Sequence, residues 1–168
     1  MQKRGRENLA AIEQNIDLVS MAKMLRHFKL LCDKILQDSL YAQRLRNIFY
    51  QSTDRGRTVR QIFWGRLGID LRPGEEQQLT KLLDAFFRKK SFRQNIPHGV
   101  RNQLLTKQNY GCAFCGCPVN EHDPVDHIVP FKYVGDELDE NYQILCKHCN
   151  SQKNATIDYQ IKILFELV

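Results

Sequence analysis

The stretch that decides the fold runs from residue 112 to residue 153 and reads CAFCGCPVNEHDPVDHIVPFKYVGDELDENYQILCKHCNSQK. It contains two Cys-x-x-Cys pairs, Cys112 with Cys115 and Cys146 with Cys149. Thiolates three residues apart across a tight turn can both bind one tetrahedral Zn²⁺, and two such turns complete a closed site. Because a closed site leaves no position for substrate, we expect a structural zinc that stabilises a unit with little apolar core.

The segment between the two pairs is 30 residues long, whereas a plain zinc ribbon has roughly 15–20 residues there. Residues 125–130, VDHIVP, predict a short apolar strand that carries an acid and an imidazole side by side. Residues 142–145, YQIL, predict the returning strand of a hairpin after a polar turn at 136–141. Residues 150–153 suit the first turn of a helix.

This order of motifs resembles the HNH endonucleases, which have the ββα-metal fold, in a His-Asn-Asn variant. The resemblance covers about a quarter of the chain, and its specificity comes from zinc and catalytic positions that match together and in order. The matching residues are Cys112, Cys115, Asp126-His127-Ile128-Val129-Pro130, Asn141, Leu145-Cys146-Lys147-His148-Cys149-Asn150 and Lys153.

Hydrolysis of a phosphodiester needs a base that deprotonates water, and a charge sink for the leaving oxygen. Imidazole titrates near a pH of about 6.5 and can accept that proton, so His127 is the candidate general base. A hard cation such as Mg²⁺ prefers oxygen ligands, and the resemblance implies that Asp126 and Asn150 supply them. It also implies that Asn141 orients the His127 segment across the hairpin, and Lys153 is a candidate phosphate contact.

Two alternatives stay open within the motif. Asn150 can instead cap a helix, because Asn is among the preferred N-cap residues. Cys117 is a further thiol that can compete with Cys115 for zinc, whereas His148 is expected to be exposed.

The chain before the motif is predicted to be helical over residues 7–50, where apolar residues recur three and four positions apart. These residues include Leu9, Ile12, Ile16, Val19, Met21, Met24, Leu25, Phe28, Leu31, Cys32, Ile35 and Leu36. Asp38 and Ser39 are a candidate cap for a further helix, so we expect two or three long helices. Such apolar stripes usually form a core, and docking to a second chain is the alternative.

The remaining segments give simpler predictions. Residues 51–74 are rich in turn-forming and basic residues, so we expect a turn-rich region there. Residues 75–90 show helical apolar spacing, and another helix is predicted to begin near Pro97. The tail, residues 155–168, fits both a strand and a helix, and we favour a helix because the preceding turn already starts one.

Basic residues are concentrated before the motif. Residues 1–110 hold 21 Lys and Arg against 10 Asp and Glu, a net charge of +11, and residues 111–168 hold 4 against 9, a net charge of −5. An acidic module binds polyanionic DNA poorly by itself, so we expect the helical part to supply most phosphate contacts. The candidate contacts, besides Lys153, are Arg88, Lys89, Lys90, Arg93 and Arg101, with residues 55–72 as a second basic segment.

The chain has neither a membrane-length apolar run nor a signal-peptide pattern at its start. Four of its six cysteines are assigned to zinc rather than to a disulfide framework, and Cys32 is expected to be a buried thiol. We therefore expect a cytoplasmic protein that does not associate with membranes.

Together these observations predict an α+β, mainly α protein. A helical region over residues 1–95 would bind DNA or a partner, and a zinc-stabilised ββα-metal module would occupy residues 96–168. The resemblance implies a DNA endonuclease that uses Mg²⁺ or Mn²⁺ and acts in restriction or anti-phage defence. Each active site would cut one strand.

A homodimer or an activating protein partner fits this prediction, because a double-strand break needs two sites. Two alternatives are a nuclease subunit that stays latent until a partner binds and a non-catalytic zinc module that binds nucleic acid.

Overall fold

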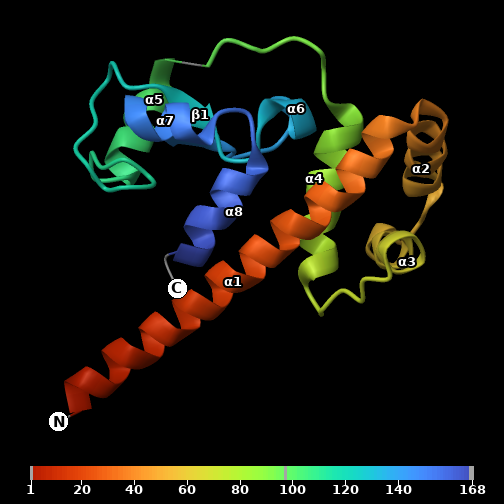
Figure 1. The fold of residues 1–168 in the computed structure, drawn as a ribbon, viewed down its shortest axis with the longest axis horizontal. Helices are drawn as coiled ribbons and strands as arrows, with labels where there is room; N and C mark the ends of the chain where they lie inside the picture. Colours follow the sequence, from red (N-terminus) through yellow and green to blue (C-terminus); the bar gives the residue numbers. More distant parts are fainter. Residues whose placement is uncertain (1, 97, 167–168) are drawn as a thin grey trace.

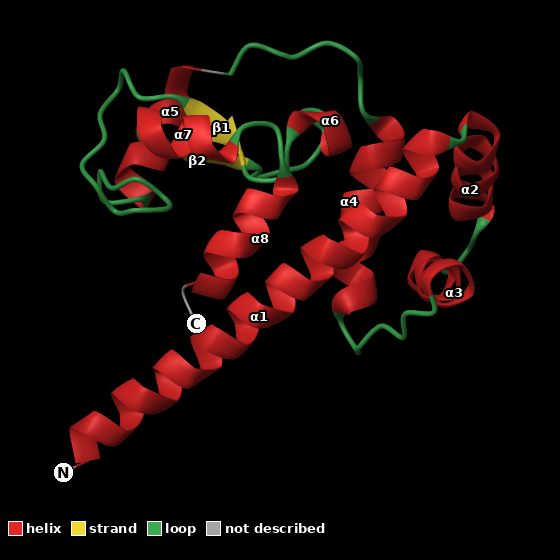
Figure 2. Cartoon of the chain, in the orientation of Figure 1, coloured by secondary structure: helices red, strands yellow, loops and turns green. Residues whose placement is uncertain are grey.

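The computed structural model describes residues 2–96 and 98–166, with side chains described over 19–96 and 99–162. It is mainly helical and contains one two-stranded antiparallel sheet (Figure 2), which confirms the predicted fold class. None of the described helices is both long enough and apolar enough to span a membrane.

The N-terminal part contains two consecutive helices, α1 (Gln2–Gln37) and α2 (Ser39–Gln51). The carboxylate of Asp38 accepts hydrogen bonds from the backbone N–H groups of Leu40 and Tyr41, so the predicted cap is confirmed. The apolar stripe of α1 forms a core from residue 22 onward; its earlier members Leu9, Ile12 and Ile16 lie outside the described side chains. The buried members are Ala22, Leu25, Phe28, Leu31, Cys32 and Ile35.

The prediction of a turn-rich region over residues 51–74 was wrong, because Arg55–Leu67 form helix α3. The Asp54 side chain accepts a hydrogen bond from the Arg57 N–H at the start of α3, and Gly68 ends the helix in the left-handed conformation, at a φ of 66°. Its buried residues are Thr58, Val59, Ile62 and Phe63. Their helical spacing was hidden among arginines and glycines that individually suggest turns.

Helix α4 (Glu75–Arg88) confirms the predicted helix over residues 75–90, and it buries Leu79, Leu82, Leu83, Ala85 and Phe86. Helix α5 (His98–Lys107) begins beside Pro97 as predicted, and α8 (Ile157–Glu166) settles the ambiguous tail as a helix. Helix α8 packs along α1, which runs diagonally across the molecule (Figure 1).

The hairpin lies between α5 and α8 in sequence. Strand β1 (Val125–His127) pairs antiparallel with β2 (Tyr142–Ile144), and Asp126 faces Gln143 in the register. The connection between the strands includes the single-turn helix α6 (Phe131–Val134), and α7 (Lys147–Lys153) follows β2. These two strands and α7 form the predicted ββα arrangement.

One apolar core joins the helical part to the hairpin segment. Its members from α1 to α4 pack with Val129, Tyr133, Val134 and Ile157 from beyond residue 96. A second, smaller core lies under the cysteine pairs and consists of Leu105, Cys112, Val119, Ile144, Leu145 and Cys149. The expected boundary at residue 95 falls in the loop between α4 and α5, yet the larger core continues across it.

Candidate active site

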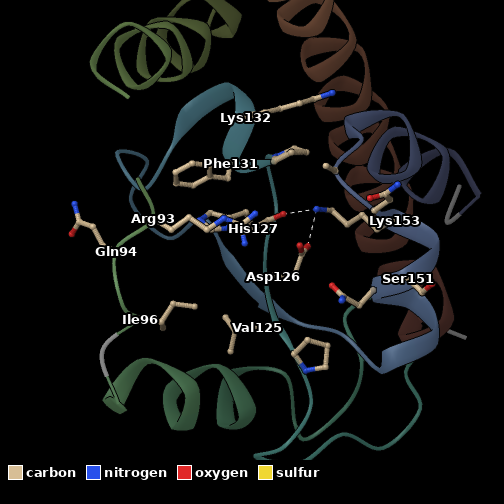
Figure 3. Close-up of a pocket in the computed structure, with 15 residues that line it drawn as sticks. Arg93, Gln94, Ile96, Val125, Asp126, His127, Phe131, Lys132, Ser151 and Lys153 are labelled. Atoms are coloured by element: carbon tan, nitrogen blue, oxygen red, sulfur yellow. Dashed lines mark hydrogen bonds and ion pairs between the residues drawn. The ribbon is translucent and has the colours of Figure 1, made fainter. Parts of the chain in front are cut away.

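A pocket of about 690 Å³ opens beside the hairpin (Figure 3). Its walls come from β1, α6, α7 and the loop that joins α4 to α5. The lining residues are Arg93, Gln94, Ile96, Pro124, Val125, Asp126, His127, Pro130, Phe131, Lys132, Asn150, Ser151, Lys153, Asn154 and Ala155.

Asp126, His127 and Asn150 all line this pocket. Neighbouring residues of a regular strand point to opposite faces, but β1 is only three residues long and ends at His127. The acid, the imidazole and the amide therefore meet at one cavity although they come from two elements. Asn150 lies within α7, whose N-cap is Cys146, so the alternative that Asn150 caps the helix is wrong.

Lys153 lies in a different environment from the one expected of a phosphate contact. Its side chain is 1% exposed, and its ammonium lies 2.7 Å from Asp126 Oδ2 and donates a hydrogen bond to the carbonyl of His127. Figure 3 shows both contacts as dashed lines. Lys153 lines the pocket, but its charge is already paired with Asp126, which makes a role in holding that carboxylate a better fit than a phosphate contact.

The ring of His127 is held by a carboxylate that sequence reasoning missed. Its Nε2 lies 2.8 Å from Asp136 Oδ1, and the same oxygen accepts a hydrogen bond from the Tyr142 hydroxyl at 2.9 Å. Oδ2 accepts a hydrogen bond from the Gln94 backbone N–H at 2.8 Å. Burial alone would raise the pKa of Asp136, but the bonds from Gln94, His127 and Tyr142 together outweigh it and lower this pKa. Asp136 is therefore ionised at neutral pH.

No local sequence signal marked Asp136. It lies in the polar segment 136–141, which reads as an ordinary turn, and it is nine residues from His127. The contact exists because Gly135, at a φ of 59°, ends α6 and directs the chain back toward β1.

Asn141 makes the contact expected of an orienting residue. Its side-chain oxygen accepts a hydrogen bond from the Val129 N–H at 2.7 Å, and its amide nitrogen donates to the Val129 carbonyl at 2.9 Å. With an exposed fraction of 3%, this amide replaces strand pairing just beyond the end of β1.

The cysteines gather in one cluster. The Sγ atoms of Cys112, Cys115, Cys117 and Cys146 lie within 4.8 Å of one another. Cys149 belongs to the cluster as well: burial and its contacts with the Cys115, Cys146 and Cys112 thiols raise its pKa. Three of the predicted ligands, Cys112, Cys115 and Cys146, therefore lie in the mutual set together with Cys117, the alternative ligand. Cys149, the fourth predicted ligand, lies beside three of these thiols.

The donor atoms fit the two expected metals. Thiolates that converge at these distances suit tetrahedral Zn²⁺. The backbone N–H and the thiol of Cys117 lower the pKa of Cys115 to about 6, which favours the thiolate that binds metal. The carboxylate of Asp126 and the amide oxygen of Asn150 suit a hard divalent cation that keeps several waters.

The basic residues predicted to contact DNA have varied surroundings. Arg93 lines the pocket, with its guanidinium 5.1 Å from the Phe131 ring centroid. Lys89 and Arg101 are less available than expected, because each donates a hydrogen bond to a backbone carbonyl, of Lys132 and Asp123 respectively. Arg88 and Lys90 both approach Glu137 at 3.9 Å, and the side chains of Arg88 and Lys90 are half exposed.

The hairpin and the helix that follows it, with a histidine at the end of the first strand and cysteines at both ends, form a ββα module. Residues 112–156 match the model of the HNH endonuclease family, so the chain contains an HNH endonuclease domain. Over 58 residues, 33% of this chain, the sequence is 38% identical to the CRISPR-associated endonuclease Cas9 of Corynebacterium diphtheriae. The chain matches only 5% of that protein's length. No solved structure matches the chain significantly.

Proposed function

We propose that this protein is a metal-dependent endonuclease that hydrolyses phosphodiester bonds in DNA. The observation that carries this proposal is the meeting of His127, Asp126 and Asn150 at one open pocket. A base and two oxygen ligands around one pocket are the groups that hydrolysis of a phosphodiester requires. A zinc scaffold alone requires none of these three.

In the proposed reaction, His127 accepts a proton from the attacking water. Among the described residues, only its Nε2 has a protein hydrogen-bond partner, so Nδ1 is the nitrogen left for this task. Asp126 and Asn150 would hold Mg²⁺ or Mn²⁺, which when bound polarises the phosphate and stabilises the leaving oxygen. Lys153 pairs with Asp126 Oδ2 at 2.7 Å and holds that carboxylate in place from the buried side.

The substrate reaches the pocket past basic side chains. Arg93 comes from the loop between α4 and α5, Lys132 comes from α6, and both line the cavity. Because the segment 111–168 is acidic as a whole, these cations and the basic helical region are the parts suited to phosphate contacts. The likeness to a CRISPR-associated endonuclease supports a role in defence against foreign DNA.

A plasmid-nicking assay with Mg²⁺, and separately with Mn²⁺, tests this proposal on zinc-loaded protein. We expect wild-type protein to convert supercoiled plasmid to the nicked form, and His127→Ala to lose this activity while it keeps its zinc. His148→Ala is the matched control, because His148 is exposed on α7. Intact plasmid with both metals would contradict a free-standing nuclease.

A second candidate is a nuclease subunit that is latent until another protein binds. Exposed apolar side chains on the helical region favour it, with Leu36 53%, Leu40 55% and Trp64 63% exposed. This candidate predicts no nicking by the isolated chain and an increase when the partner is added. A non-catalytic zinc module predicts DNA binding that His127→Ala leaves unchanged and no cleavage under either condition.

A further inference from the structure

We propose that Asp136 is a positioning residue that holds His127 in the tautomer protonated on Nε2, so that Nδ1 is directed to the attacking water. This inference rests on the proposed role of His127 as the general base. Asp136 does not touch the substrate in this arrangement, and it acts through the imidazole alone.

The contact between the two side chains is short and largely shielded from solvent. Asp136 Oδ1 and His127 Nε2 are 2.8 Å apart, and the side chains are 6% and 11% exposed. An ionised carboxylate can only accept hydrogen bonds, so the ring nitrogen that faces it must carry the proton. In the neutral imidazole, Nδ1 then has the free lone pair that a general base needs.

Asp136 is itself fixed from two other directions. Tyr142 donates to Oδ1 and the Gln94 backbone N–H donates to Oδ2, so both oxygens have partners. The rings of Tyr142 and Phe131 lie 4.9 Å and 5.7 Å from the imidazole centroid. These contacts leave little freedom for the ring of His127 to flip and exchange its nitrogens.

The helical part of the protein contributes directly to this arrangement. Gln94 belongs to the loop that leaves α4, and Gly135 packs against the other end of that loop. A Cβ atom at Gly135 would lie 3.1 Å from Lys89 Cβ and 3.4 Å from Lys89 Cα. The position of Asp136, and with it the tautomer of His127, therefore depends on the segment that joins the two parts of the chain.

The competing interpretation is that Asp136 only stabilises the turn after α6. Its bond to Gln94 fits that interpretation equally well, so stability measurements cannot separate the two. A spectroscopic signature of the imidazole can separate them, because a turn-stabilising carboxylate has no reason to select one ring nitrogen for protonation.

The test is nitrogen-15 NMR of histidine-labelled, zinc-loaded full-length protein without Mg²⁺, at a pH above the ordinary histidine range. We expect His127 to show a protonated Nε2 whose proton exchanges slowly with water and an unprotonated Nδ1. Asp136→Ala should lose the slowly exchanging proton. Asp139→Ala should retain it, because Asp139 is an exposed carboxylate in the same connection.

Several outcomes would overturn the proposal. One is a wild-type His127 protonated on Nδ1, and another is an Asp136→Ala protein with an unchanged Nε2–H signal. If Asp136→Ala does not fold, Asp136→Asn preserves the volume and should weaken the signal, since a neutral amide is a poorer acceptor than a carboxylate. An unchanged signal in that variant counts equally against the proposal.

Nicking kinetics separate this inference from the proposed function. We expect Asp136→Ala to lower kcat on the order of 10²-fold, within the range that general-base catalysis contributes, with little change in KM. If the wild type nicks DNA and Asp136→Ala is equally fast, the positioning role fails and the nuclease assignment stands. If the wild type does not nick, the NMR result still decides whether Asp136 selects the tautomer.

Discussion

Tyr133 donates a hydrogen bond from its hydroxyl to Asp33 Oδ1 at 3.1 Å, across a separation of 100 residues in the sequence. Tyr133 lies in α6 and Asp33 in α1, so this contact joins the nuclease segment to the helical part. The ring of Tyr133 is 1% exposed and packs edge-on against Phe28, with centroids 6.1 Å apart. Nearby, Lys29 of α1 pairs with both Asp33 and Asp158, at 3.1 Å and 3.6 Å.

Tyr133→Phe is therefore expected to destabilise the whole chain rather than one part of it. The substitution removes a partly buried hydrogen bond to a carboxylate, which contributes about 1 to 2 kcal/mol to the free energy of unfolding. Urea unfolding followed by far-UV circular dichroism should show one transition at a lower midpoint. Tyr110→Phe, at a site 59% exposed, should unfold like wild type, and two separate transitions would contradict the shared core.

Asn141→Ala is expected to lower stability more strongly. It leaves the buried N–H and carbonyl of Val129 without their amide partner, and each unsatisfied group costs about 1 to 3 kcal/mol. We expect a loss of about 2 to 4 kcal/mol in urea unfolding of the zinc-loaded protein. Asn102→Ala, at an exposed site on α5, serves as the control. A loss at Asn141 no larger than this control would show that water replaces the amide.

Cysteine substitutions should show which thiols contribute most to the affinity for zinc. Cys149 contacts three other thiols of the cluster, Cys115, Cys146 and Cys112, so Cys149→Ser is expected to weaken metal binding by more than the roughly 10–100-fold typical of outer-shell partners. Cys117→Ser should bind with near wild-type affinity, because four ligands complete the tetrahedron without it. Competition with a chromophoric chelator and the absorption of the Co²⁺-substituted protein measure both. The reverse ranking would identify Cys117 as the fourth ligand.

Metal removal should affect the second core first. That core is small: Cys112 and Cys149 belong to it, and Cys117 and Cys146 pack against it. We therefore expect its stability to depend on an ion that bridges these thiols. We expect chelation of zinc to expose the amides of Ile144 and Leu145 to hydrogen exchange before those of Leu79 and Leu83 in α4. Simultaneous exposure of both sets would indicate that zinc holds the entire chain together.

Gly135→Ala should affect both stability and the site. The residue has a positive φ, so a residue with a side chain has a backbone strain of about 1 to 3 kcal/mol there. The added Cβ would also lie against Lys89, so the loop must shift to make room for it. We expect a lower thermal midpoint together with a weakened Nε2–H signal of His127. Gly99→Ala is the matched control, because nothing lies within 4 Å of its added Cβ and it should leave both readouts unchanged.

The cysteine cluster and the hairpin could be predicted because their determinants are local. Each Cys-x-x-Cys turn places its two thiols together whatever surrounds it, and residues 142–145 show the alternation of a returning strand. The same holds for Asp38 at the cap of α2. Helix α3 was missed although its signal is local, because its arginines and glycines obscured the spacing of Val59, Ile62 and Phe63.

Other features depend on contacts that no sequence window contains. The burial of Lys153 follows from the fold of α7 against β1, which places its ammonium next to Asp126 and leaves it 1% exposed. The partner of Arg101 is the carbonyl of Asp123 in a loop 22 residues away. A basic side chain looks the same in the sequence whether it faces solvent or a carboxylate.

The sequence by itself predicted the two cysteine pairs, the ββα arrangement and the histidine in it, since these depend on motifs and spacing within one stretch of the chain. Only the tertiary structure decided which nitrogen of that histidine faces a carboxylate. That choice requires Asp136, Tyr142 and Gln94 to converge from three separate segments. It also decided that the helical part and the nuclease segment share one core, because burial of Tyr133 and Ile157 against α1 arises only when the whole chain folds.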